Sequence, residues 1–112
     1  MEYAELLKRL TVDCKDDGKQ FRKKDRIHEI KALLENSGYE LLGEGNLSLL
    51  YGKPMEEENT YRTLVSSHVD CVYKNCFAKD EDELCWKGTF DNSATNAAVI
   101  DLMLRGELDE SV

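Results

Sequence analysis

The last helical stretch of this chain is apolar around nearly its whole circumference. It reads SATNAAVIDLMLRG, from Ser93 to Gly106, with Asp91, Asn92 or Ser93 as its expected cap and Gly106 as its stop. A helix of this kind is normally buried on most sides. The segment GELDESV, from Gly106 to Val112, offers little to cover its second side, so we expect part of it to stay open. Its apolar residues are Ala97, Ala98, Val99, Ile100, Leu102, Met103 and Leu104.

Two amphipathic helices are predicted near the start of the chain. Apolar residues at the i, i+3, i+4, i+7 spacing predict one helix over residues 2–11. A second apolar stripe predicts a helix over residues 22–36, and Gly38 is placed to end it in the left-handed conformation. The two stripes consist of Tyr3, Leu6, Leu7 and Leu10, and of Ile27, Ile30, Leu33 and Leu34.

After Gly38 the pattern changes to that of strands. The segment YELLGEGNLSLLYGKP predicts one or two strands around Gly43 and Gly45, closed by Pro54. The segment TLVSSHV, residues 63–69, carries few charges and several β-branched residues, which favours a buried central strand.

A second pair of strands is predicted before the last helix. The segment NCFAKDEDELCWKG, residues 75–88, reads as two short strands joined by the acidic turn Lys79–Asp82. The order helix, helix, strands, central strand, hairpin, helix predicts an α/β fold, and residues 1–112 suffice for a single domain.

Charge and composition narrow the classes of partner. The net charge of −8 disfavours nucleic acid, because the only basic cluster is FRKKDR, residues 21–26, which we expect at the exposed start of the second helix. No apolar run approaches the ~18 residues of a membrane span, and MEYAELLKRL lacks the apolar core of a signal peptide. We therefore expect a cytoplasmic protein without membrane partners, whose four cysteines are reduced.

His68 and Asp70 form the first candidate site. In an extended chain, residues two apart point to the same face, so the Asp70 carboxylate can reach the His68 imidazole. This pairing fixes the imidazole tautomer, which a metal-binding histidine requires. Ligands also bind at the carboxyl ends of strands in α/β sheets. A His-x-Asp pair is common, however, and on its own it is more often only the polar end of a strand.

Asp91 is the second candidate, because it directly follows the short connection Gly88-Thr89-Phe90 at the start of the last helix. An aspartate in this place is most often an N-cap, worth ~1 kcal/mol. The connection is also tight enough to return the helix start to the sheet edge. A carboxylate held there has two oxygens and can bridge two divalent metal ions.

These residues carry a resemblance to a known family. HVDCV, starting at His68, and KGTFDNSATNAAVIDLML, starting at Lys87, resemble the first two metal motifs of the co-catalytic zinc exopeptidases. That superfamily includes bacterial leucyl aminopeptidases, glutamate carboxypeptidases and related peptidases and deacylases. The upstream order of elements is also similar, so the resemblance runs from about Leu6 to Leu104.

The resemblance implies a fold and a two-metal site. The fold would be part of a three-layer α/β/α arrangement with a central mixed sheet. His68 would bind one of two zinc ions, Asp91 would bridge both, and Asp70 would serve catalysis by orienting His68. The complete enzyme would be a metallopeptidase-like hydrolase that acts on peptides or N-acyl amino acids, with an aminopeptidase, a carboxypeptidase and a deacylase all open.

The sequence departs from the family pattern after Asp91. The family continues with an adjacent Glu-Glu pair, which supplies the general base and a ligand, then a further acidic ligand and a final histidine. Glu107 and Glu110 are not adjacent, Glu56–Glu58 precede the first motif, and His28 lies within the second helix. We therefore expect residues 1–112 to be the N-terminal part of a longer enzyme and to be inactive alone.

Three alternatives use other residues. A Cys3His structural zinc site is one, although reduced cysteines more often pack as small apolar groups. A cysteine nucleophile is another, and it would need a histidine base. The third is a non-catalytic binding module on a peptidase scaffold, with Tyr73 and Trp86 as contact residues, and an uncovered last helix would favour self-association. The Cys3His site would use His68, Cys71, Cys76 and Cys85.

Overall fold

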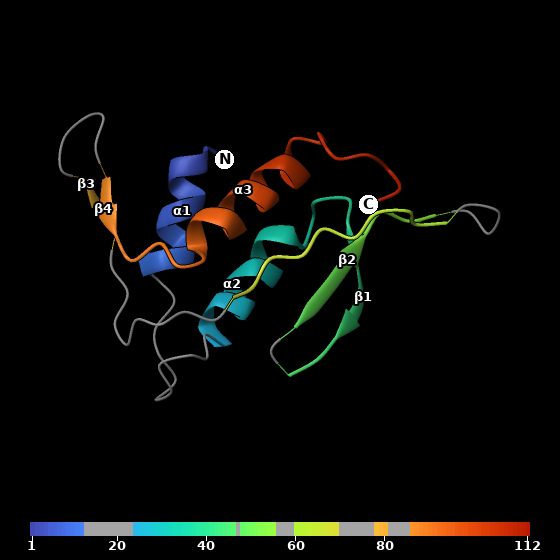
Figure 1. The fold of residues 1–112 in the computed structure, drawn as a ribbon, viewed down its shortest axis with the longest axis horizontal. Coiled ribbons are helices and arrows are strands. Elements are labelled where there is room, and N and C mark those ends of the chain that lie inside the picture. Colours follow the sequence, from blue (N-terminus) through green and yellow to red (C-terminus); the bar gives the residue numbers. More distant parts are fainter. Residues whose placement is uncertain (13–23, 47, 56–59, 70–77, 81–85) are drawn as a thin grey trace.

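The computed structural model describes residues 1–12, 24–46, 48–55, 60–69, 78–80 and 86–112. In Figure 1 the helices lie in the middle of the molecule, with the β3–β4 pair on one side of them and the β1–β2 pair on the other. The elements are α1 (Tyr3–Val12), α2 (Lys24–Leu34), β1 (Glu40–Glu44), β2 (Leu49–Gly52), β3 (Ala78–Asp80), β4 (Trp86–Gly88) and α3 (Ser93–Leu104). The predicted helices, the strands expected around Gly43 and Gly45 and the second pair of strands are therefore confirmed, with ends within three residues of the predicted ones.

The core lies where the three helices meet. The apolar stripe of α1 turns inward, and Leu6 and Leu10 are completely buried. Ala97 and Ile100 of α3 belong to the same core. A buried hydrogen bond, in which Thr11 Oγ1 donates to Ser93 Oγ at 2.6 Å, joins the end of α1 to the start of α3. This contact fixes where α3 begins, which is where the candidate site lies.

The helix α2 ends as predicted. Gly38 follows it with φ = 88°, in the left-handed region. A Cβ atom at this position would meet no other atom within 4 Å, so the requirement for glycine is conformational rather than steric. The turn is supported by Ser37, whose hydroxyl donates to the Leu34 carbonyl at 2.8 Å. The chain then enters β1.

The strands form two separate antiparallel pairs. Strand β1 pairs with β2, from Glu40 opposite Gly52 to Glu44 opposite Leu49, and a bulge interrupts the register between Leu41 and Gly43. Strand β3 pairs with β4 in the other sheet. The fold is thus mixed α/β. The described residues contain two two-stranded sheets instead of the single central mixed sheet that the resemblance implied.

The prediction of a central strand over residues 63–69 was wrong. These residues are not part of a strand, and within the described part of the chain β1 and β2 pair only with each other. A strand exists through its hydrogen bonds to neighbouring strands, whereas an apolar pattern specifies only burial. At its start the segment is held by the C-terminal loop, because Arg62 N and Thr63 N donate to the Ser111 carbonyl at 2.8 and 3.3 Å.

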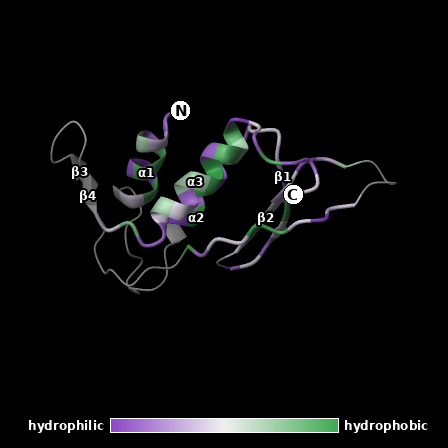
Figure 2. Ribbon diagram, turned by 45° about the horizontal axis from the view of Figure 1, so that its top comes forward, coloured by the Kyte–Doolittle hydropathy of each residue, from purple (hydrophilic) through white to green (hydrophobic). Residues whose placement is uncertain are grey.

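The helix α3 is buried along one face. Ser93, Asn96, Ala97, Ile100 and Met103 face inward, while Leu102 is 37% exposed. Figure 2 shows apolar colouring along much of this helix. The second side of α3 is therefore open, as its composition led us to expect.

The basic cluster does not lie wholly on the surface. The expectation that residues 21–26 cover an exposed helix start was wrong for Arg26, whose side chain is completely buried. Its guanidinium donates to backbone carbonyls inside the molecule, which compensates part of the cost of its burial. None of the helices in the described part of the chain is both long and apolar enough to span a membrane.

Candidate functional site

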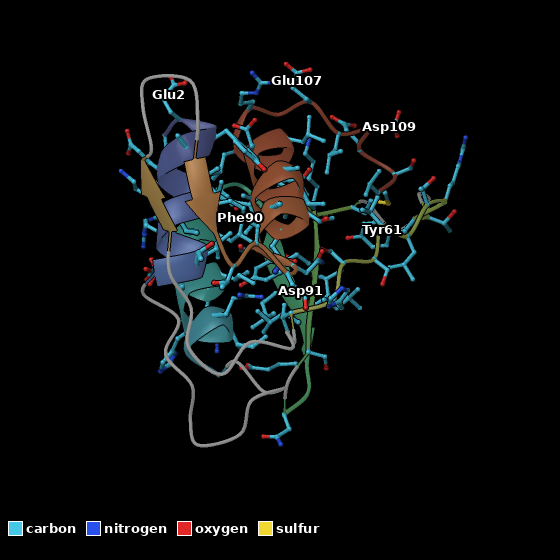
Figure 3. The ribbon with its side chains drawn as sticks, turned by 60° about the vertical axis from the view of Figure 1, so that its left-hand side comes forward. Glu2, Tyr61, Phe90, Asp91, Glu107 and Asp109 are labelled. Atoms are coloured by element: carbon cyan, nitrogen blue, oxygen red, sulfur yellow. The ribbon has the colours of Figure 1, made fainter. Side chains whose placement is uncertain are left out.

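The structure brings together the two predicted metal ligands. His68 Nε2 lies 3.8 Å from Asp91 Oδ1, although the two residues belong to different segments. The histidine comes from the extended segment 60–69, and Asp91 comes from the connection between β4 and α3, beside Phe90 in Figure 3. The separation is too long for a hydrogen bond. It is close to the spacing of two ligands on one metal ion.

The separation of this pair can be compared with that of two ligands of one zinc ion. Zinc bonds to nitrogen and oxygen are about 2.0–2.2 Å long, so two ligand atoms in a tetrahedral site lie about 3.4 Å apart. A shift of a few tenths of an ångström would let one ion reach both atoms. The His68 side chain is 56% exposed and that of Asp91 is 34% exposed, so an ion can reach them from solvent. Among the described residues, no cluster of three or more His, Cys, Asp or Glu side chains forms a metal site.

Asn92 connects the two sides of this pair, which we call the metal pair. Its Nδ2 donates to the His68 carbonyl at 2.8 Å and to Ser67 Oγ at 3.0 Å. Ser67 Oγ in turn donates to Asn96 Oδ1 at 2.6 Å, one turn further along α3. The first turn of α3 thus holds the backbone next to His68 through two amide side chains.

The start of α3 distinguishes between the two roles predicted for Asp91, helix N-cap and metal ligand. The N-cap residue is Asn92, and its side chain makes no capping hydrogen bond. Asp91 lies one residue before the cap, so the interpretation of Asp91 as the N-cap was wrong. The Asp91–Asn92 peptide bond is cis. The Asp91 side chain faces the His68 imidazole instead.

Arg26 holds the other side of the metal pair. Its Nη1 donates to the Val69 carbonyl at 2.9 Å and to the Asp91 carbonyl at 3.3 Å. Its Nε donates to the Leu10 carbonyl at 3.1 Å, near the end of α1. The backbone on both sides of the metal pair therefore contacts one guanidinium group.

An apolar cleft begins beside His68. Its volume is about 590 Å³, and it lies between the inner faces of α2 and α3, the β1–β2 hairpin and the extended segment. Burial raises the pKa of Tyr39 and of Tyr51, so both phenols in its wall stay neutral at physiological pH. Its polar lining residues include Ser66, Ser67, His68 and Asn96. The polar end of the cleft thus includes His68, whereas Asp91 does not line it.

Several predicted residues lie outside the described part of the chain. These include Asp70, the predicted partner of His68, and all four cysteines of the sulfur alternatives. Tyr73 and Glu56–Glu58 also lie outside it, and the side chain of Trp86 is not described. The second histidine, His28, is exposed on α2 and is not part of the metal pair.

Sequence reasoning missed the residues that support the metal pair. Arg26 lies four residues before Ile30, on the apolar stripe of α2, and a charged residue at such a position signals a buried partner. Asn92 was considered only as a helix cap. No signal in the sequence pointed to Ser67 or Asn96, because their contacts depend on the packing of α3 against the extended segment.

Comparisons of the chain with protein-family models, with curated proteins and with solved structures found no match.

Proposed function

We propose that this chain is the N-terminal part of a zinc-dependent, exopeptidase-like hydrolase that cleaves peptide or amide bonds. In this proposal His68 binds one zinc ion, Asp91 bridges it to a second, and Asp70 orients the His68 imidazole. The general base and the remaining ligands come from residues beyond this sequence. Residues 1–112 alone therefore bind zinc weakly and do not turn over substrate.

The observation that carries the proposal is the distance of 3.8 Å between His68 Nε2 and Asp91 Oδ1. The resemblance implies that both residues bind the same zinc ion, which requires their side chains to lie close together, and this separation agrees with that requirement. Asp91 also lies one residue before the N-cap, Asn92, so it does not itself cap the helix. The pairing therefore supports a shared ligand.

The chemistry follows from the donor set. When bound, zinc polarises a substrate carbonyl and lowers the pKa of a bound water to about 7. His68 supplies a nitrogen donor, and Asp91 supplies two oxygens that can face two ions. Asn92 and Arg26 donate hydrogen bonds to the backbone carbonyls of these two residues, which ties their backbone to the start of α3 and to α2.

The proposal extends to the whole protein. The longer chain would complete a three-layer α/β/α fold around a central mixed sheet, with β1 and β2 contributing two of its strands. We place the enzyme in the cytoplasm, acting on peptides or N-acyl amino acids, with no nucleic acid or membrane as partner.

Zinc titration of residues 1–112 tests the proposal. We expect weak binding, measured by calorimetry and by zinc-induced NMR shifts, that His68→Ala abolishes and Asp91→Asn weakens, because each change removes a proposed donor. His28→Ala is the matched control, since it removes the other histidine, on an exposed face of α2, and leaves the metal pair intact. Aminoacyl and N-acyl substrates should remain uncleaved.

Two results would contradict the proposal. Zinc binding that survives His68→Ala but is lost in Cys76→Ala or Cys85→Ala would replace the metal pair by a sulfur site. Robust metal-dependent hydrolysis by residues 1–112 would show that the general base lies within this sequence.

A binding module is the second candidate function, and the apolar cleft favours it. A cleft of about 590 Å³ that opens beside exposed leucines is typical of a surface that binds a partner. If zinc had no effect on the NMR spectrum while an apolar peptide shifted the signals of Leu64 and Val65, the scaffold would serve binding rather than hydrolysis.

A further inference from the structure

Arg26 occupies an environment that needs a functional explanation. Its side chain has 0% exposure, although arginine is among the residues least often buried. Removing a charged group from water is costly unless that group is paired and fully hydrogen-bonded. Among the described residues, Arg26 Nη2 has no hydrogen-bond partner. A buried polar group left unsatisfied in this way calls for an explanation, and a role in a functional site is one.

The contacts of Arg26 connect three separate segments. Nε donates to Leu10 O, near the end of α1, at 3.1 Å. Nη1 donates to Val69 O, in the residue after His68, at 2.9 Å, and to Asp91 O at 3.3 Å. One nitrogen thus lies within hydrogen-bonding distance of the backbone on both sides of the metal pair.

The planar guanidinium suits this arrangement better than any other side chain. It presents five N–H donors in a fixed fork, so it can bind carbonyls from several directions without moving. A lysine places a single nitrogen at the end of a flexible stem and lacks the Nε donor. A glutamine keeps donors but loses both the charge and the reach.

We infer that Arg26 is the positioning residue of the metal pair: its guanidinium fixes the backbone beside His68 and the backbone of Asp91 at the separation that lets one divalent ion bind both side chains. The zinc part of this inference rests on the proposed function. The part that concerns the His68–Asp91 separation does not, because it describes the protein without metal. Arg26 acts through these two residues and does not itself bind the ion.

Two variants and one control test this inference in residues 1–112. Arg26→Gln removes the fork, and Arg26→Lys keeps the charge with a single donor. Arg9→Gln is the matched control, because it removes an arginine of α1 that pairs with Glu29 of α2, away from the metal pair. Each protein is measured well below its unfolding temperature, so that a loss of stability alone does not change the result.

The first measurement is made without metal. We expect NOEs between the His68 imidazole protons and the Asp91 side-chain protons in the wild type and in Arg9→Gln. They should disappear in Arg26→Gln and weaken in Arg26→Lys. If Arg26→Gln does not fold, the weaker NOEs expected in Arg26→Lys still test the inference.

The second measurement is zinc affinity by calorimetry. Loss of a residue that orients metal ligands typically lowers affinity by about 10- to 100-fold. We expect a change of this size in Arg26→Gln, a smaller one in Arg26→Lys and none in Arg9→Gln.

The two measurements distinguish the positioning role of Arg26 from the proposed zinc-dependent function. If the wild type binds no zinc but Arg26→Gln still loses the NOEs, the proposed function fails and the positioning role of Arg26 stands. Unchanged NOEs in Arg26→Gln and Arg26→Lys would overturn the inference, and so would an equal loss of zinc affinity in Arg9→Gln.

Discussion

Asn92, at the start of α3, makes two side-chain hydrogen bonds to the segment that carries His68. Its Nδ2 donates to the His68 carbonyl and to Ser67 Oγ, and it makes no capping hydrogen bond of its own. A typical hydrogen bond contributes about 1 kcal/mol net. We therefore expect Asn92→Ala to lower the free energy of unfolding by about 2 kcal/mol, measured by urea denaturation.

A matched pair of variants shows whether the donor atom is responsible. Asn92→Asp keeps the shape but replaces the donor with an oxygen, which repels the His68 carbonyl, so it should destabilise at least as much as Asn92→Ala. Thr95→Ala, on the exposed face of α3, should change stability little. An Asn92→Ala variant as stable as Thr95→Ala would show that Asn92 does not hold the His68 segment.

The identity of the candidate ligands could be predicted from the sequence, and their surroundings could not. His68 and Asp91 stand out because each lies in a short local motif. Arg26 and Ser67 contribute through contacts with residues far away in the chain, at distances that no local pattern encodes. Asn92 was found as a cap because capping is a local rule, but its side chain is used for a non-local contact.

Among the elements, the C-terminal loop supports the segment that carries His68. Asp109 accepts hydrogen bonds from the Ser111 hydroxyl at 2.6 Å and from the Ser111 amide at 2.8 Å. The Ser111 carbonyl then accepts from the amides of Arg62 and Thr63. The turn at Asp109 thus presents a carbonyl to the start of the extended segment.

The charge of Asp109 should therefore be linked to folding. The hydrogen bonds from Ser111 lower the pKa of Asp109 below its ordinary value of 3.8. A lowered folded-state pKa means that the contribution to stability is complete above the ordinary value and is lost as the pH falls through the lowered one. We expect an NMR titration of the Asp109 carboxyl to show a midpoint below 3.8, and Ser111→Ala to raise it.

A control and a second measurement make this prediction specific. Ser48→Ala, in the β1–β2 loop, should leave the Asp109 midpoint unchanged. Because Ser111→Ala keeps the backbone carbonyl but loosens the turn, amide exchange at Arg62 should become faster. A midpoint for Asp109 at its ordinary value in the wild type would show that the turn does not form in solution.

The elements differ in how far the sequence predicted them. The first two helices follow from apolar periodicity and Gly38, and the last follows from its apolar run between a cap and Gly106, because a helix makes its hydrogen bonds within itself. The β1–β2 hairpin follows from neighbouring segments that alternate around glycines. Residues 63–69 have the composition of a buried strand, but pairing requires a partner from elsewhere in the fold, and apolar composition does not supply one.

At the scale of the whole molecule, apolar side chains on one side stay in contact with solvent. Leu64 is 77% exposed and Val65 is 45% exposed at the edge of the 590 Å³ cleft. Exposed apolar patches of this kind promote association. The net charge of −8 opposes it through repulsion, which salt screens over about 8 Å at 0.15 M. Self-association should therefore increase with both protein concentration and ionic strength.

Sedimentation velocity tests this prediction directly. We expect residues 1–112 to shift from monomer toward dimer as concentration and salt rise, and Leu64→Glu to keep the protein monomeric, because a charge at the cleft edge would have to be buried in the dimer. Leu42→Glu is the matched control, since Leu42 is 45% exposed on β1 and does not line the cleft. Association that persists unchanged in Leu64→Glu would place the contact elsewhere, and a wild type that stays monomeric at high salt would show that the open apolar surface does not bind a second copy.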